Sequence, residues 1–275
     1  MEKTNLLRRA KHFLRLYRVS PKKRLGQNFA VNSGMLQQLV SHASLTEDDV
    51  VLEVGPGFGF LTQFIADKCK KVIAVEVDPQ LVSFLRNQNN LQNVNLIEGD
   101  ILKVTLPPFN KVVSAPPYSI SSPLIFHLLE QQFDWAVLIL QKEFAERLAA
   151  SVGTKDYGRL TVNVYYRADV ELLDFVPRTM FYPPPDVDSM MVRLTPRAPP
   201  FPVDDEKTFF DLVRTLFTQR NKKVRNGLIS FLNQHNITGK EAVELADSTI
   251  YSKKRVRELA PEDFGILANE LLRKF

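Results

Sequence analysis

The sequence predicts an α/β fold in which helices cover both faces of a mostly parallel sheet, followed by a small helical domain. Short apolar runs alternate with helical stretches between residues 50 and 150, which is the pattern of repeated strand–helix units. A proline-rich break after about Thr195 then separates this region from a segment with helical periodicity only. Of the 275 residues, 44% are hydrophobic, which is enough for one substantial core and a smaller one.

Five apolar runs are the expected strands. They are apolar on both faces, as strands are in a parallel sheet that is covered on both sides. In chain order they span residues 50–54, 72–75, 94–97, 111–114 and 135–140.

Helical stretches follow most of these runs. In chain order they span residues 60–68, 79–86, 123–130 and 143–150. Two further helices are expected before the sheet: a short amphipathic helix within the first twenty residues, and one over about 35–42 that Asn32 or Ser33 caps.

Four prolines between 196 and 202 form a stiff break, because proline fixes φ and removes a hydrogen-bond donor. Beyond it, residues 206–275 show helical spacing of apolar residues. We therefore divide the chain into a basic N-terminal arm (1–30), an α/β domain (31–196) and a helical domain (197–275).

Basic residues cluster in three places, although lysine and arginine exceed the acids only by 36 to 31. Such clusters are typical of proteins that bind a phosphate backbone, and each one alone is equally typical of a solvated helix face. The clusters are Lys3, Arg8, Arg9, Lys11, Arg15, Arg18, Lys22, Lys23 and Arg24; then Arg214, Arg220, Lys222, Lys223 and Arg225; then Lys253, Lys254, Arg255 and Arg257.

Several classes of protein are disfavoured. No apolar run approaches the ~20 residues of a membrane-spanning helix, and no secretory signal is recognisable at the N-terminus. The single cysteine, Cys69, forms no internal disulfide, which fits a cytoplasmic location, and we expect it to be structural or incidental. The four histidines are scattered and no Cys/His cluster exists, so we predict no metal.

A glycine loop directly follows the first strand and indicates a nucleoside-containing cofactor. Gly55, Gly57 and Gly59 allow the backbone to turn sharply and approach a ligand closely. The dinucleotide fingerprint is G-x-G-x-x-G, whereas here the third glycine comes one residue early and Phe60 takes its place. This spacing argues against a dinucleotide-binding dehydrogenase.

Two acids follow the next two strands. Glu76 is placed to accept hydrogen bonds from ribose hydroxyls, and Asp100 is placed to meet an adenine amine. Each acid alone is typical of a solvated strand end, but their order on successive strand ends supports the cofactor site.

Several segments in a fixed order resemble the dimethyladenosine transferases of small-subunit ribosomal RNA, in particular their archaeal and eukaryotic branch. The resemblance covers nearly the whole chain. The segments are KRLGQNF (23–29), LEVGPG (52–57), PY (117–118) followed by ISSP (120–123), GTKDYGRL (153–160) and FYPPPDVDS (181–189).

The resemblance implies a Rossmann-like class I methyltransferase sheet with S-adenosylmethionine as cofactor. In this family the adenine amine is activated by an Asn side chain and by the carbonyl of the next residue, here Pro116. Tyr118 then corresponds to the aromatic platform for the extruded base, with Phe181 on its opposite face. Asn28 and the backbone of Ala30 are implied near the methionine end of the cofactor, although the family usually has leucine at position 30.

The chain departs from the family in the motif at residues 114–118, which follows the fourth expected strand. Where the family has Asn, this chain has Ala115, whose methyl group accepts no hydrogen bond. Ser114 comes one residue early and is expected to point to the other side of the strand. Position 115 remains assigned to both the catalytic and the cofactor site, with activity expected to be reduced.

The substrate and partners follow from the resemblance alone. They are two adjacent adenines near the 3′ end of small-subunit rRNA, each dimethylated, within a precursor ribosomal subunit. RNA is expected to run across the basic arm and the helical domain, and loop 153–159 either faces RNA or is a surface connection. We expect a monomer that does not act at a membrane.

Three alternatives remain open. A large-subunit rRNA adenine methyltransferase that confers antibiotic resistance shares the chemistry but is expected to lack segment 153–160. A non-catalytic ribosome-assembly or transcription factor that retains the fold is favoured by Ala115. The third alternative is a dehydrogenase, which the glycine spacing disfavours. Only a failure to bind S-adenosylmethionine would support it.

Overall fold

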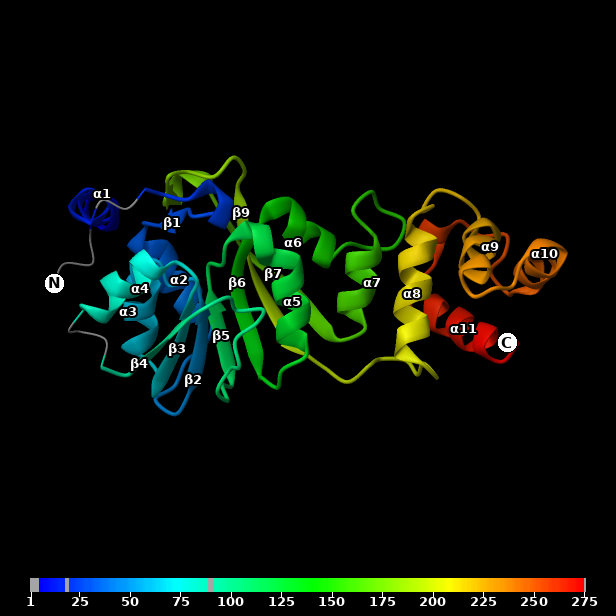
Figure 1. The fold of residues 1–275 in the computed structure, drawn as a ribbon, viewed down its shortest axis with the longest axis horizontal. Helices are drawn as coiled ribbons and strands as arrows, with labels where there is room; N and C mark the ends of the chain where they lie inside the picture. Colours follow the sequence, from blue (N-terminus) through cyan, green and yellow to red (C-terminus); the bar gives the residue numbers. More distant parts are fainter. Residues whose placement is uncertain (1–4, 18–19, 89–91, 275) are drawn as a thin grey trace. The chain divides into compact units, whose positions relative to one another are not determined.

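In the computed structural model, residues 5–17, 20–88 and 92–274 are described, and they form two compact units (Figure 1). The first, the sheet unit, comprises Met1–Ala145 and Val170–Pro196. The second, the helical unit, comprises Glu146–Asp169 and Arg197–Phe275. Residues 146–169 thus group with the C-terminal helices and not with the α/β domain, to which the sequence pattern assigned them.

The sheet unit is built on a seven-stranded sheet with the order β4-β3-β2-β5-β6-β9-β7. The pairs from β4 through β6 are parallel and β9 runs antiparallel to β6, which confirms a mostly parallel sheet. Each of the five expected strands is found, with ends that agree within one residue. The strands are β2 (Val50–Val54), β3 (Lys71–Glu76), β4 (Val94–Glu98), β5 (Lys111–Ser114), β6 (Trp135–Gln141), β7 (Ala168–Val176) and β9 (Ser189–Pro196).

Helices precede and connect these strands. They are α1 (Leu6–Leu16), α2 (Ser33–His42), α3 (Phe60–Ala66), α4 (Pro79–Arg86), α5 (Ser121–Leu129) and α6 (Lys142–Leu148). The side chain of Asn32 accepts a hydrogen bond of 2.9 Å from the backbone N–H of Met35, so α2 begins where the sequence predicts. Asp78 caps α4, and Pro79 occupies its first turn.

The order of the strands places a crevice at the centre of the sheet. From β2 the chain crosses to β3 and β4, and then returns past β2 to β5 and β6. Because such crossovers are right-handed, α3 and α4 cover one face and α5 covers the other. The direction reverses between β2 and β5, and ligands of such sheets bind at the carboxyl ends of the strands at this point.

Helix α1 packs on the sheet unit, so part of the expected N-terminal arm is a core element. Leu6 and Ala10 are buried, and the Phe13 ring lies 4.8 Å from that of Phe84 between centroids. The guanidinium of Arg9 lies 5.1 Å from the centre of the Phe60 ring. Lys3 and Arg18 of the first basic cluster lie outside the described residues.

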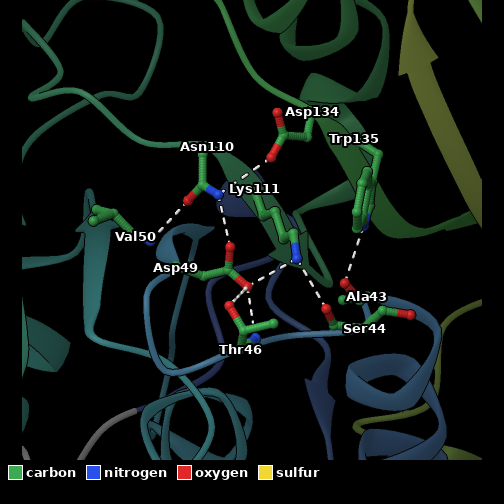
Figure 2. A network of polar contacts seen from close by, with 9 residues as sticks. All are labelled: Ala43, Ser44, Thr46, Asp49, Val50, Asn110, Lys111, Asp134 and Trp135. Carbon is green, nitrogen blue, oxygen red and sulfur yellow. Dashed lines mark hydrogen bonds and ion pairs between the residues drawn. The ribbon is translucent and has the colours of Figure 1, made fainter.

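A buried polar network joins the amino ends of three strands, opposite the crevice (Figure 2). Lys111 at the start of β5 lies 2.8 Å from the Asp49 carboxylate before β2, and 4.3 Å above the Trp135 ring at the start of β6. Asn110 links Asp49 to Asp134 through its side-chain amide.

The helical unit contains α8 (Glu206–Phe217), α9 (Val224–Gln234), α10 (Gly239–Ser248) and α11 (Pro261–Leu272), as the helical periodicity after residue 206 predicts. It also contains α7 (Arg159–Tyr165), which that periodicity does not cover. Its core includes the fully buried rings of Phe209, Phe231 and Phe264. Tyr157 joins this core, and its hydroxyl donates to the Leu259 carbonyl at 2.7 Å. Within the described ranges, no helix is long and apolar enough to span a membrane.

Candidate functional site

A cavity of about 220 Å³ lies at the carboxyl ends of β2, β3, β4 and β5 in the sheet unit. Every site residue named from the sequence lines it, so the structure brings the whole set together. These residues are Asn28, Ala30, Gly55, Gly57, Glu76, Asp100, Ala115, Pro116, Tyr118 and Phe181.

The glycine loop after β2 forms the floor of the cavity. Gly55, Gly57 and Gly59 have φ values of 70°, 60° and 74°, which disfavour any residue with a side chain. A Cβ at Gly57 would lie 3.0 Å from the Phe29 ring, and one at Gly55 would lie 3.3 Å from Pro117. The loop therefore needs glycine both for its turn and for the close approach of its neighbours.

Glu76 at the end of β3 is fixed by backbone groups. Its Oε2 accepts from the Gly57 N–H at 3.2 Å and its Oε1 accepts from the Asp78 N–H at 2.9 Å. It is buried, and burial raises the pKa of its carboxyl group. Each oxygen keeps a lone pair that is available to a ligand hydroxyl.

Asp100 lies two residues beyond the end of β4 and is partly exposed. Its Oδ1 accepts from the Leu102 N–H at 3.1 Å, which fixes the turn after the strand. The Lys103 ammonium lies 3.6 Å from its other oxygen.

Residues 20–30, which we call the strap, cover one side of the cavity. Phe29–Ala30 forms β1, which pairs with Phe181–Tyr182 (β8). The Asn28 amide donates to the Gly26 carbonyl at 3.2 Å. The pairing of β1 with β8 holds Ala30 opposite Phe181, so the strap links the wall that contains Asn28 to the aromatic part of the cavity.

The segment after β5 forms a second wall of the cavity, adjacent to the strap. The Ser114 hydroxyl is buried and donates to the Val54 carbonyl at 2.7 Å, so it points away from the cavity as expected. Ala115 and Pro116 line the cavity directly. Among the described residues, no donor reaches the Pro116 carbonyl, which leaves it available to a ligand amine.

Tyr118 and Phe181 form the aromatic part of the cavity. Their ring centroids lie 6.5 Å apart with planes at 70°, so they meet edge to face and do not form a parallel slot. The Tyr118 hydroxyl lies 2.6 Å from Ser189 Oγ, and burial raises the pKa of the Tyr118 phenol. Phe181 is only 4% exposed, so Tyr118 offers the more accessible face.

Other cavity residues were not named from the sequence. Val77 and Ile101 each follow a strand-end acid directly, and Glu53, Gly99 and Ser119 are also among the lining residues. The sequence carries a signal for both residues, because an acid is followed by an aliphatic residue at two strand ends, in Glu76-Val77 and in Asp100-Ile101. An aliphatic residue beside an acid suits a flat ring that also carries hydrogen-bonding groups.

Glu53 is a buried acid of β2 that faces the cavity. It is 1% exposed, and within the described part of the chain its Oε2 has no hydrogen-bond partner. Burial, together with the nearby Glu76 carboxylate, raises the pKa of Glu53 to about 8. The ligand-free site therefore resists holding two negative charges.

We expect Glu53→Gln to change how stability depends on pH. The folded pKa of Glu53 exceeds its unfolded value, so its contribution is full below the unfolded pKa and is lost as pH rises through about 8. Between these two pKa values, the free energy of unfolding of the unchanged protein falls relative to Glu53→Gln by ~1.4 kcal/mol per pH unit. Urea denaturation of the ligand-free proteins across this range measures the slope. A difference that does not vary with pH would contradict the raised pKa.

In the helical unit, three separate segments join into one basic surface, made of residues 153–157, 219–225 and 252–258. The Arg257 N–H donates to the Arg220 carbonyl at 3.1 Å, and the Gly153 N–H donates to the Arg257 carbonyl at 3.1 Å. The Arg220 guanidinium holds the loop through the carbonyls of Thr154 (3.0 Å) and Lys155 (2.7 Å). The exposed cations are Lys155, Lys222, Lys223, Lys253, Lys254, Arg255 and Arg257.

Several cations of these clusters have acidic partners, including Lys254, whose ammonium lies 3.7 Å from the Asp263 carboxylate. Arg225 pairs with Asp247, and Arg214 pairs with Asp211. Loop 153–157 thus lies beside the second and third basic clusters.

The sequence profile of the family described as ribosomal RNA adenine dimethylase matches residues 18–271. The chain belongs to this family. A probable ribosomal RNA small subunit methyltransferase A of Methanosarcina acetivorans is 45% identical over 248 residues, which cover 89% of this chain and 91% of the relative. The protein of the same description from Pyrococcus furiosus is 40% identical over 256 residues, which cover 92% of each chain.

Two solved structures share the fold of the family. The dimethyladenosine transferase from Plasmodium falciparum is 31% identical with a TM-score of 0.72, and the match covers 89% of this chain and 96% of that one. The 23S rRNA methyltransferase ErmE is 29% identical with a TM-score of 0.65, and the match covers 89% and 99%. These matches confirm the resemblance and the α/β methyltransferase fold predicted from the sequence.

Proposed function

We propose that this protein transfers methyl groups from S-adenosylmethionine to the N6 amine of adenine in small-subunit ribosomal RNA. The observation that carries the proposal is one cavity that joins a glycine loop, two strand-end acids and residues 115–118. Relatives named for the small subunit are 40–45% identical, against 29% for ErmE, which favours the small-subunit target. The proposal includes dimethylation of two adjacent adenines near the 3′ end, on a precursor subunit, by a cytoplasmic monomer.

The cavity fits this cofactor chemically. Glu53 and Glu76 are buried acids with raised pKa values, and a cationic ligand offsets the electrostatic penalty of ionising them. S-adenosylmethionine, when bound, supplies an electrophilic methyl group on a positively charged sulfur. We assign Glu76 to the ribose, Asp100 to the adenine ring, and Gly55, Gly57, Asn28 and Ala30 to close backbone and amide contacts.

The residues around position 116 orient and activate the target amine. The lone pair of an adenine amine is delocalised into the ring, which makes the amine a weak nucleophile. The Pro116 carbonyl accepts one N–H, which favours a tetrahedral nitrogen and stabilises the charge that develops on it. Tyr118 stacks on the extruded base, and Phe181 supports Tyr118 from its edge.

Ala115 removes the second acceptor from this arrangement. Its methyl group lines the cavity at the position of the family's Asn, and Ser114 is turned away. We therefore propose a slow enzyme. The second candidate, a ribosome-assembly factor that binds RNA without methylating it, is favoured by this same residue.

The test is transfer of radiolabelled methyl groups to unmethylated small ribosomal subunits. Slow transfer supports the proposed enzyme. Binding of both S-adenosylmethionine and subunits without transfer would establish the assembly factor instead. Failure to bind S-adenosylmethionine would overturn the cofactor assignment.

We propose that RNA contacts the basic surface of the helical unit, and we expect Lys222→Glu with Lys223→Glu to weaken that binding. Each lysine that contacts a phosphate releases a counterion, so losing two contacts lowers the slope of log K against log salt by about 2. Filter binding of subunits at several salt concentrations measures this slope. The matched control is Lys207→Glu with Lys240→Glu, which makes the same charge change outside the three segments. Unchanged binding by the first variant would exclude this surface.

A further inference from the structure

Asp78 stands at the turn between β3 and α4, two residues after Glu76, and is fully buried. Two side chains of the strap reach it from across the chain. The Lys22 ammonium lies 2.7 Å from Oδ1 and the Gln27 amide donates to Oδ2 at 2.8 Å. Both carboxylate oxygens are therefore occupied by the strap.

The contact closes into a circuit on both sides. Within the strap, the Lys22 N–H donates to the Gln27 side-chain carbonyl at 2.8 Å, which fixes the two residues relative to each other. On the sheet side, the Asp78 N–H donates to Glu76 Oε1, and Glu76 Oε2 accepts from Gly57. A continuous hydrogen-bonded path thus runs from the strap to the acid and the glycine loop of the cavity.

The strap touches the rest of the cavity mainly by packing. Gly26 lies so close to the motif segment that a Cβ would meet Ser119 at 3.3 Å and Pro117 at 3.4 Å. Phe29 packs on Gly57, with ring centroids of Phe29 and Phe58 4.4 Å apart. Packing of this kind allows the strap to slide along the cavity wall, whereas a charge-assisted hydrogen bond fixes its position.

We propose that Asp78 is a positioning residue whose buried carboxylate latches the strap, residues 20–30, over the cavity and so holds the cofactor-binding wall in place. The identity of the ligand that the latch encloses rests on the proposed function, whereas the latch itself rests on the contacts of Asp78 with Lys22 and Gln27. Burial alone would raise the pKa of Asp78, but the hydrogen bonds from Lys22, Gln27 and Gln80 lower it below the ordinary value. The carboxylate is therefore charged at neutral pH, as the latch requires.

The latch also couples the two ends of the cavity. The strap continues into β1, which pairs with β8 and places Ala30 opposite Phe181. A strap released at Asp78 loosens the partner strand of Phe181 as well as the wall that contains Asn28. Ligand binding and strap closure then favour each other, because each stabilises the same closed state.

The test is Asp78→Asn, which removes the charge but keeps the cap of α4, since Asn caps helices as well as Asp does. Limited trypsin digestion reports the open strap through cleavage of the Arg24–Leu25 bond. We expect cleavage about tenfold faster in the variant, the effect of losing one charge-assisted hydrogen bond. S-adenosylhomocysteine is expected to bind more weakly, and to restore protection when saturating.

Further variants separate the latch from general folding. Gln27→Leu and Lys22→Met disrupt the strap side without touching Asp78, and are expected to give the same protease sensitivity. The double variant Lys22→Met with Asp78→Asn is expected to be cleaved little faster than Asp78→Asn alone, because both substitutions break the same contact between Lys22 and Asp78. Asp205→Asn makes the matched change at the cap of α8 in the helical unit and is expected to leave cleavage unchanged.

The two proposals fail in different ways. Unchanged cleavage at Arg24–Leu25 in both Asp78→Asn and Gln27→Leu would overturn the latch, because this measurement is made without ligand. Absence of S-adenosylhomocysteine binding by the unchanged protein would overturn the proposed cofactor and leave the protease result to decide the latch.

Discussion

Ala115→Asn is expected to raise the rate of methyl transfer to adenine about 100-fold, which is the effect of one preorganised transition-state acceptor worth ~3 kcal/mol. The amine of adenine has two N–H groups, and in the proposed arrangement the Pro116 carbonyl accepts only one of them. The amide oxygen of Asn at position 115 supplies the second acceptor beside it. The rate is measured with radiolabelled cofactor on unmethylated small subunits under single-turnover conditions.

The two methyl transfers are expected to respond differently to this substitution. After the first transfer, N6-methyladenine retains a single N–H, which the Pro116 carbonyl satisfies by itself. Ala115→Asn is therefore expected to accelerate the first transfer more than the second, and digestion to nucleosides distinguishes mono- from dimethylated product. Ala115→Leu adds a branch of similar size without an acceptor and is the matched control. Equal acceleration by Leu would show that packing, not hydrogen bonding, limits the rate.

Much of the candidate site could be predicted because parallel strands place their carboxyl ends at one edge of the sheet. The glycines after β2, Glu76 at the end of β3 and Asp100 after β4 are far apart in sequence but lie at the same edge of the sheet. Recognising the strands was therefore sufficient to gather these residues. Their chemical roles came from the family resemblance and remain proposals.

Other features leave no local trace in the sequence. β7 has mixed polar and apolar residues because it lies at the edge of the sheet, so its periodicity did not identify it as a strand. Lys22 and Asp78 are 56 positions apart, and each alone is an ordinary charged residue. The same holds for Lys111 and Asp49, which are 62 positions apart. Pairing over such separations is decided by the tertiary fold.

Lys111→Met is expected to lower the free energy of unfolding by ~3–5 kcal/mol, because it leaves a buried charge without its counterion. The Lys111 and Asp49 side chains are only 5% and 6% exposed, and the ammonium also donates to the Ser44 carbonyl at 2.9 Å (Figure 2). Burial alone would raise the pKa of Asp49, but hydrogen bonds from Lys111, Thr46 and Asn110 lower it. Because the folded pKa lies below the unfolded one, this stabilisation is present at neutral pH and is lost as pH falls through the lowered pKa.

The double substitution Asp49→Asn with Lys111→Met tests this explanation. It removes both charges, so it is expected to be more stable than Lys111→Met alone, although Lys111→Met has one mutation fewer. Urea denaturation at neutral pH compares the proteins. Lys240→Met breaks the exposed ion pair with Glu244 and is expected to change stability little, since water screens such pairs. If the double variant is instead less stable than Lys111→Met, the hydrogen bonds that the Asp49 carboxylate accepts from Thr46 and Asn110 outweigh the cost of its unpaired charge. In that case the network stabilises the amino ends of β2 and β5 mainly through the hydrogen bonds that converge on Asp49, because an amide at this position offers one acceptor oxygen in place of two.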